Sequence, residues 1–195
     1  MNTYIEPCVL KETSEGLARY TLADALFQNR EIMIIGEITP DLVNSAILQM
    51  RYLQNLDEQK EITVFINSPG GDVASGLALY DVMQAVKCPI RTICVGSAFS
   101  MGALLFVSGD KREILAHSKV MIHDPLISNG YGGSALKIET LSKNLMKRRD
   151  IIAGILALHS KKTLKEILEK TSTDTYFDAE EAVAYGLADK IIYEI

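Results

Sequence analysis

Three short segments of this chain are almost entirely apolar, and each one leads into a segment with helical signals. The apolar segments are Glu31 to Ile35 (EIMII), Glu61 to Ile66 (EITVFI) and Ile90 to Val95 (IRTICV). A strand with apolar side chains in successive positions offers no face to water, so it is typical of a parallel sheet that helices cover on both faces. The alternation of such strands with helices predicts an α/β fold around a parallel sheet.

The helices that follow these strands have recognisable starting points. The first is expected to open at Thr39-Pro40, because proline is favoured at the first helical position. The second should run from Asp72 to Val86, and its polar residues form one narrow stripe, so nearly all of this helix is expected to be buried. The third should run from Ser100 to Ser108, directly after its strand.

Two short strands are expected next, from Arg112 to Ala116 and from Lys119 to Ile122. The residues between them, His117 and Ser118, predict a turn that joins the two strands as a hairpin. His117 is then a solvated histidine in a turn.

Two further helices complete the expected order. A long helix should run from about Ser134 to Ser160, and its apolar stripe suits packing against another helix, in the same chain or in a neighbouring subunit. The sequence Asp178-Ala-Glu-Glu181 is typical of a capping box, which opens a last helix that ends at Gly186.

The composition is that of a globular protein with one domain. The chain has 195 residues, of which 48% are apolar and 23% are charged, and its net charge is −5. These values exclude a disordered chain and a small disulfide-stapled scaffold. The sequence has no basic patch, so nucleic acid is not an expected partner. We expect a single domain over residues 1–195, because no linker or repeat interrupts the chain.

Several features predict a cytoplasmic protein. The three cysteines show no C-x-x-C spacing, which fits reduced thiols better than disulfides. The first residues are too polar for a signal peptide. The segment from Thr92 to Gly109 carries no charge, but glycines interrupt it, so we interpret it as a buried strand and a buried helix rather than a membrane span.

The position of His123 makes it the best candidate for a general base. It ends the strand VMIH, directly before Asp124-Pro125, and sites of α/β proteins lie at the carboxyl ends of strands. His159 falls on the apolar stripe of the long helix, where packing is the simpler interpretation.

Ser100 is a candidate nucleophile at the junction of a strand and a helix. The sequence GSAFSMGA resembles a nucleophile elbow, although Ala98 stands in place of the first glycine of G-x-S-x-G. The free amides of a helix N-terminus would favour negative charge that develops there. The alternative is that Ser100 is only the N-cap of the helix.

The glycine pair Gly70-Gly71 lies between a buried strand and a buried helix. Two glycines let the backbone turn sharply and bring an amide close to a ligand, which would suit an oxyanion hole. A tight turn capped by Asp72 explains the same residues. Among the acids that might orient His123, Asp174 remains by elimination, because no capping role is evident for it.

Four sequence blocks together resemble the ClpP peptidase family, the proteolytic subunit of ATP-dependent Clp proteases. The blocks are INSPGGDVASGLALYD, GSAFSMGALL, VMIHDPL and TDTYFDAEEAVAYGLAD. The resemblance implies a crotonase-like α/β spiral of ββα units with a protruding handle helix. It also implies that Ser100 is the nucleophile, His123 the base and Asp174 the orienting acid, with the amides of Gly71 and Met101 as the oxyanion hole.

The resemblance further implies how such a subunit works. It would hydrolyse unfolded polypeptides inside heptameric rings stacked as a tetradecamer, and a separate AAA+ unfoldase would use the ATP, so the subunit needs no cofactor or metal. Residues 1–20 would form an axial segment and residues 124–160 the handle region. The alternatives are a catalytically silent scaffold subunit of a mixed ring, and an acyl-CoA enzyme of the crotonase fold.

The chain also departs from the family pattern. Thr173 and Lys137 stand where the family pairs an arginine with an acid between rings, so we expect weaker ring stacking. The family sequence MIHQP reads MIHDP, and the loop from Leu126 to Gly133 is longer than usual. Thr63 and Phe65 replace two tyrosines that face the ATPase docking pocket in many members.

Overall fold

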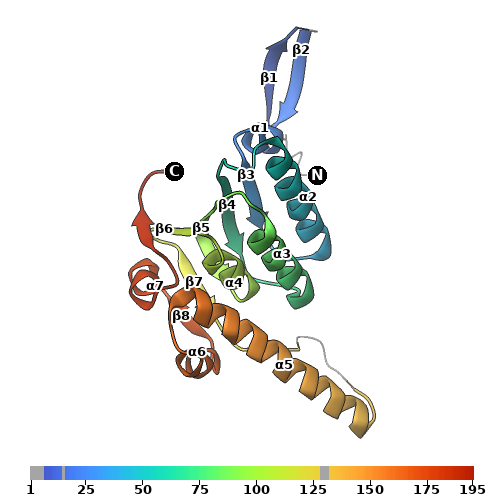
Figure 1. The fold of residues 1–195 in the computed structure, drawn as a ribbon, viewed down its shortest axis with the longest axis vertical. Helices are drawn as coiled ribbons and strands as arrows, with labels where there is room; N and C mark the ends of the chain where they lie inside the picture. Colours follow the sequence, from blue (N-terminus) through green and yellow to red (C-terminus); the bar gives the residue numbers. More distant parts are fainter. Residues whose placement is uncertain (1–6, 15, 128–131) are drawn as a thin grey trace, which may run out of the picture.

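A seven-stranded sheet forms the centre of the molecule, and every strand pair in it except one is parallel (Figure 1). The computed structural model describes residues 7–14, 16–127 and 132–195. Strands β3, β4, β5, β6 and β9 lie side by side in this order, β7 pairs with β5, and the antiparallel pair joins β7 to β8. The strand bounds are β3 Glu31–Ile35, β4 Ile62–Ser68, β5 Ile90–Phe99, β6 Lys111–Leu115, β7 Lys119–Ile122, β8 Thr175–Phe177 and β9 Lys190–Ile192.

Seven helices are found in the described residues, and a hairpin of two strands stands apart from the sheet (Figure 1). The hairpin is formed by β1 (Cys8–Thr13) and β2 (Gly16–Thr21), within the segment that was expected to be axial; residues 1–6 and 15 of that segment lie outside the described residues. The helix bounds are α1 Leu22–Gln28, α2 Pro40–Leu56, α3 Val73–Ala85, α4 Met101–Val107, α5 Ala135–Ser160, α6 Leu164–Thr171 and α7 Ala179–Tyr185.

The predicted helix ends are confirmed where a local cap defines them. The Thr39 hydroxyl accepts a hydrogen bond from the Leu42 amide at the start of α2. Asp178 and Glu181 form the expected capping box of α7, and Gly186 ends that helix with a φ of 93°. These signals depend only on neighbouring residues, so the sequence states them directly.

The expectation that helices cover both faces of the sheet is wrong for the single chain. Ile32 and Ile34 of β3 are buried in the main core, together with residues of α2, α3 and α4. The alternate residues point to the second face, where a much smaller cluster holds Phe65, Ile93 and Ile192 and where Ile35 is 56% exposed. Apolar side chains in successive positions therefore fill one covered face and leave the other partly open.

Strands β6 and β7 do not form the predicted hairpin. Both run parallel to β5, with β6 paired to residues 91–94 and β7 paired to residues 97–99. The turn at His117 and Ser118 keeps the direction of the chain and moves it from the first half of β5 to the second half. β5 itself continues through Gly96 to Phe99, further than expected, because its second half gains β7 as a partner.

The long helix α5 protrudes from the body of the molecule (Figure 1). Its C-terminal half packs on the core through Ile152, Ala153 and Leu156, whereas apolar residues of its N-terminal half, such as Leu136 and Ile138, are exposed. The expectation that nearly all of the helix from Asp72 to Val86 is buried is wrong, since only Gly76, Leu79 and Met83 are buried in α3. The loop from Leu126 to Gly133 lies partly outside the described residues.

Candidate active site

Ser100 stands on a sharp turn between β5 and α4. Its backbone has a φ of 55° and a ψ of −120°, a region that residues other than glycine rarely adopt. The Ser100 amide donates a hydrogen bond to the carbonyl oxygen of Met121 at 2.8 Å, which ties this turn to β7. Ser100 occupies the N-cap position of α4, but its side chain makes no capping hydrogen bond. The hydroxyl is therefore directed elsewhere.

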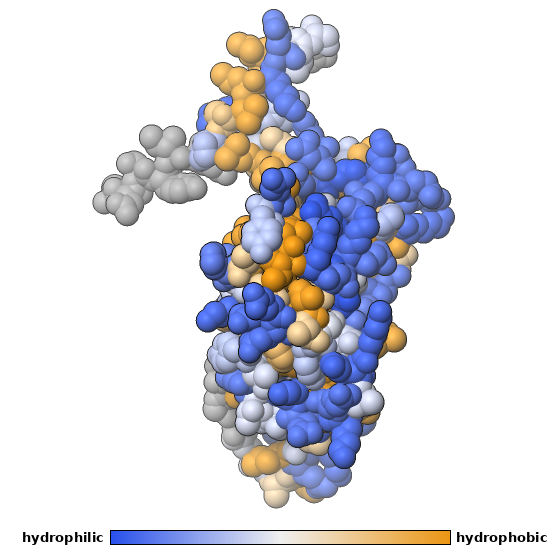
Figure 2. Space-filling model, turned by 90° about the vertical axis from the view of Figure 1, so that its left-hand side faces the viewer, coloured by the Kyte–Doolittle hydropathy of each residue, from blue (hydrophilic) through white to orange (hydrophobic). Residues whose placement is uncertain are grey.

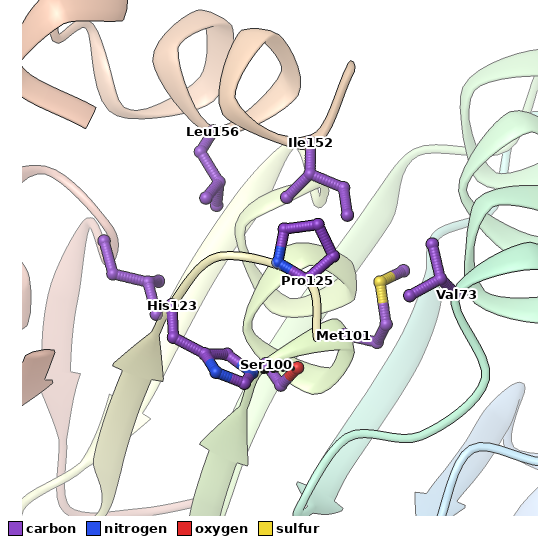
Figure 3. A pocket seen from close by; sticks show the side chains of 8 residues that line it. Val73, Ser100, Met101, His123, Pro125, Ile152 and Leu156 are labelled. Carbon is purple, nitrogen blue, oxygen red and sulfur yellow. Dashed lines mark hydrogen bonds between the residues drawn. The ribbon is translucent and has the colours of Figure 1, made fainter. Parts of the chain in front are cut away.

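The hydroxyl of Ser100 lies beside the imidazole of His123. Oγ of Ser100 and Nε2 of His123 are 2.8 Å apart, a normal hydrogen-bond distance (Figure 3). His123 directly follows β7, and the pairing of β7 with β5 brings the ends of the two strands together. The parallel sheet thus supplies the proximity of two residues that are 23 positions apart.

Asp174 lies on the other side of the same imidazole. Its Oδ1 atom is 3.4 Å from Nδ1 of His123, and its side chain is 59% exposed. The residue precedes β8, whose pairing with β7 sets Thr175 opposite Ile122. Ser100, His123 and Asp174 therefore form a continuous row. The contact between Ser100 and His123 is close, and the contact between His123 and Asp174 is longer.

The glycine turn lies against this row. Gly70 and Gly71 have φ angles of 101° and 153°. The carbonyl oxygen of Gly70 accepts a hydrogen bond from the Ile38 amide, and the Asp72 amide donates to the Ile38 carbonyl oxygen, both at 2.8 Å. The Asp72 carboxylate also caps α3, because it accepts hydrogen bonds from the hydroxyl and the amide of Ser75. These two hydrogen bonds lower the pKa of the Asp72 carboxyl. The turn is thus both capped and adjacent to Ser100.

Two hollows meet at Ser100 and His123. The smaller is apolar and is walled by Ile122 and by residues that Figure 3 labels around the pair, namely Val73, Met101, Pro125, Ile152 and Leu156. The larger, of about 570 Å³, is open and includes Gly70, Gly71 and Arg148 in its wall. Val73 and Pro125, together with Ser100 and His123, wall both hollows.

The other two histidines lie away from this row. His117 is exposed in the turn between β6 and β7, as expected. His159 packs edge-on against the Tyr80 ring, with 5.9 Å between the ring centroids. Burial, and to a smaller extent the positive charge of Arg112, lowers the pKa of His159. In residues 7–14, 16–127 and 132–195, no group of His, Cys, Asp or Glu side chains is placed to hold a metal ion. No helix in these ranges is long and apolar enough to cross a membrane.

A comparison of nearly the whole sequence with protein-family models shows the family. A family model described as Clp protease matches residues 14–194 of the 195 residues. The chain belongs to the Clp protease family. The parallel sheet, its helices and the protruding α5 fit the crotonase-like α/β fold of the family, so the expected fold class is confirmed.

Sequence reasoning missed part of the surroundings of the row in this Clp protease family member. It interpreted the apolar stripe of the long helix as a packing surface alone, although Ile152 of that helix also walls the apolar hollow. It interpreted Gly70 only as part of a sharp turn or an oxyanion hole, although the missing side chain of Gly70 also makes room for Ser100. In the sequence, only the glycine pair pointed to this role of Gly70, and no neighbouring residue showed which of the two glycines lies against Ser100.

Proposed function

We propose that this chain is a serine endopeptidase subunit in which Ser100 is the nucleophile, His123 the general base and Asp174 the acid that orients the base. The observation that carries the proposal is the 2.8 Å distance between Oγ of Ser100 and Nε2 of His123. A serine hydroxyl is a weak nucleophile until an adjacent base takes its proton. Membership of a peptidase family makes peptide bonds the favoured substrate.

The reaction would proceed through an acyl-enzyme. His123 takes the proton of Ser100 as Oγ attacks the carbonyl carbon, and it returns this proton to the leaving amine as the peptide bond breaks. Water then attacks the ester, with His123 again as the base, and the acid product leaves Ser100 free. The Asp174 carboxylate accepts a hydrogen bond from Nδ1–H of His123 and stabilises the imidazolium that forms during acylation and again during deacylation.

The amides of Gly71 and Met101 would stabilise the negative oxygen of the tetrahedral intermediate. Met101 is the first residue of α4, where the helix leaves amide groups without carbonyl partners. Gly71 walls the open hollow, and its neighbours Gly70 and Asp72 are fixed to Ile38. Such fixed donors are worth about 10²–10³ in rate when one is removed from an oxyanion hole.

We also propose the assembly that the family implies: heptameric rings stacked as a tetradecamer in the cytoplasm, fed with unfolded polypeptide by a separate AAA+ ATPase. This subunit would use no cofactor or metal. Exposed apolar residues on α5, such as Leu136, Ile138 and Met146, support packing against other subunits. Figure 2 shows a further group of apolar side chains near the middle of one face, of the kind that marks interaction surfaces.

A serine-reactive probe tests the proposed chemistry. A fluorophosphonate should form an adduct on Ser100, found by mass spectrometry of the digested protein, and Ser100→Ala should lose both the adduct and the hydrolysis of short peptides. Ser97→Ala is the matched control, because the Ser97 hydroxyl donates to Asn67 and lies outside the row. An adduct elsewhere, or full activity of Ser100→Ala, contradicts the proposal.

The same experiment, together with an acyl-CoA turnover assay, separates the two alternatives. A subunit that forms rings without reacting with the probe would be a catalytically silent scaffold. Turnover of an unsaturated acyl-CoA without peptide hydrolysis would indicate an acyl-CoA enzyme. The row of Ser100, His123 and Asp174 supports neither alternative, since a scaffold has no need of it and crotonase-type chemistry relies on a glutamate.

A further inference from the structure

Asp124, which follows His123, is hydrogen-bonded through both carboxylate oxygens and through its amide. Oδ2 of Asp124 accepts a hydrogen bond from Nε of Arg149 at 2.5 Å, and Oδ1 accepts one from the Thr171 hydroxyl at 2.6 Å. The Asp124 amide donates to the carbonyl oxygen of Thr171 at 2.7 Å. The side chains of Asp124 and Arg149 are 31% and 22% exposed, and Thr171 is buried. These contacts are therefore partly protected from water.

Three segments meet in these contacts. Asp124 continues β7, Arg149 belongs to the middle of α5, and Thr171 is the last residue of α6. Arg149 also donates to the carbonyl oxygen of Leu168 at 3.4 Å, so the same guanidinium links α5 to α6. The end of the strand that bears His123 is thereby fixed to both helices.

Asp174 lies on the segment that follows Thr171. It lies three positions after Thr171, and its carboxylate is mostly exposed. Within the residues that the structure describes, the His123 imidazole is the only polar partner found for this carboxylate. The segment that carries Asp174 is held on one side by the pairing of Thr175 with Ile122, and on the other by the contacts of Thr171 with Asp124.

We infer that Asp124 is a positioning residue, which, with Arg149 and Thr171, sets the place of Asp174 beside His123. The role of the row itself rests on the proposed peptidase function. Asp124 receives donors on both carboxylate oxygens, so an amide at this position would turn its own NH₂ group toward one of them. The resemblance implies an amide here (MIHQP), whereas the MIHDP of this chain supplies the carboxylate that pairs with Arg149.

A spectroscopic test avoids any need for activity. In the Ser100→Ala protein, an Nδ1 proton of His123 that is shared with the Asp174 carboxylate, 3.4 Å away, should give a downfield proton NMR signal and exchange slowly with water. Adding Asp124→Asn should speed this exchange at least about tenfold, since the segment with Asp174 opens more readily. His123→Asn identifies the signal by removing it.

Asp189→Asn is the matched control. Asp189 likewise binds an arginine, Arg112, and accepts from a backbone amide, but neither residue walls the hollows at Ser100. This variant should leave the His123 signal unchanged even if it lowers the melting temperature. An Asp124→Asn protein with the parent's exchange rate, or a parent protein without the signal, overturns the inference.

Peptide hydrolysis gives the second measurement. With Ser100 intact, Asp124→Asn should lower kcat about 10–100-fold and leave KM nearly unchanged, which is the effect of a displaced catalytic group. Arg149→Gln should act in the same direction, and the double variant should be no worse than Asp124→Asn alone. Additive losses would show that Asp124 and Arg149 act independently. Wild-type protein without peptidase activity contradicts the proposed function, whereas the NMR result still decides the role of Asp124.

Discussion

Gly70 lies so close to Ser100 that a Cβ atom on Gly70 would stand 2.7 Å from the Cβ atom of Ser100. The same added atom would lie 2.9 Å from the carbonyl oxygen of Phe99. Both neighbours belong to the turn that presents the Ser100 hydroxyl to His123. The missing side chain at position 70 is therefore a condition for the geometry of the row.

Gly70→Ala should greatly reduce labelling of Ser100 by a fluorophosphonate, because the methyl group displaces the turn. Gly36→Ala is the control: Gly36 also has a positive φ, of 85°, but nothing lies within 4 Å of its added Cβ. The control should lose about 1–2 kcal/mol of stability from its backbone and keep the labelling rate. Equal labelling of the two variants would show that the turn tolerates the contact.

Asp174→Asn should lower kcat for a fluorogenic peptide by about 10²–10⁴, because the amide no longer stabilises the imidazolium or fixes its tautomer. KM should change little, since Asp174 does not wall either hollow at Ser100. Asp178→Asn, four positions away, should leave kcat unchanged, as asparagine caps a helix as well as aspartate does. A fully active Asp174→Asn protein would exclude Asp174 as the orienting acid.

The Glu113 carboxylate should make stability depend on pH. Burial would raise the pKa of Glu113, but Arg91 and Lys190 more than offset it, so the pKa lies below its ordinary value of 4.5. A lowered pKa stabilises the fold above 4.5, and this contribution is lost as the pH falls through the lowered value. Glu113→Gln should therefore lose about 1.5–3 kcal/mol at neutral pH, measured by urea unfolding. The difference from wild type should shrink as the pH falls below 4.5, and a constant difference would contradict the assignment.

The thiols should differ sharply in reactivity. Burial raises the pKa of Cys94 to about 12, and the thiolate is the reactive form, whereas Cys8 is exposed. Iodoacetamide at about pH 8 should alkylate Cys8 in the native protein and Cys94 only after denaturation, as measured by peptide mass spectrometry. Native alkylation of Cys94 at the rate of Cys8 would mean that β5 opens readily.

Stacked rings of this subunit should separate on dilution more readily than the family pattern implies. Thr173 and Lys137, both exposed, cannot form the arginine–acid pair expected at their positions. One exposed pair contributes only about 0–1 kcal/mol, but a ring repeats the loss at every subunit. Analytical ultracentrifugation of a dilution series, with peptidase activity followed in parallel, should show single rings with falling activity. Fully active double rings at nanomolar concentration would show that α5 contacts suffice.

The sequence by itself determined several helix caps and the order of the central strands and helices, but β1, β2, α1, α6, β8 and β9 were not predicted from it. Thr39, Asp72, Asp178 and Gly186 act on backbone groups within a few residues of themselves, so no distant part of the chain can change their role. The sequence also made Ser100 and His123 candidates for the site, because a strand end and a helix start are local features. The choice between capping and another role for Ser100 was not local.

Tertiary structure decided what depends on partners far away in the chain. The pairing of β6 and β7 with successive parts of β5 replaced the expected hairpin and set Ser100 beside His123. An apolar pattern records which side chains avoid water but not which element covers them, so one face of the sheet and most of α3 are more open than expected. The link between Asp124 and Arg149 joins residues 25 positions apart, and only the packing of α5 against the end of β7 creates it.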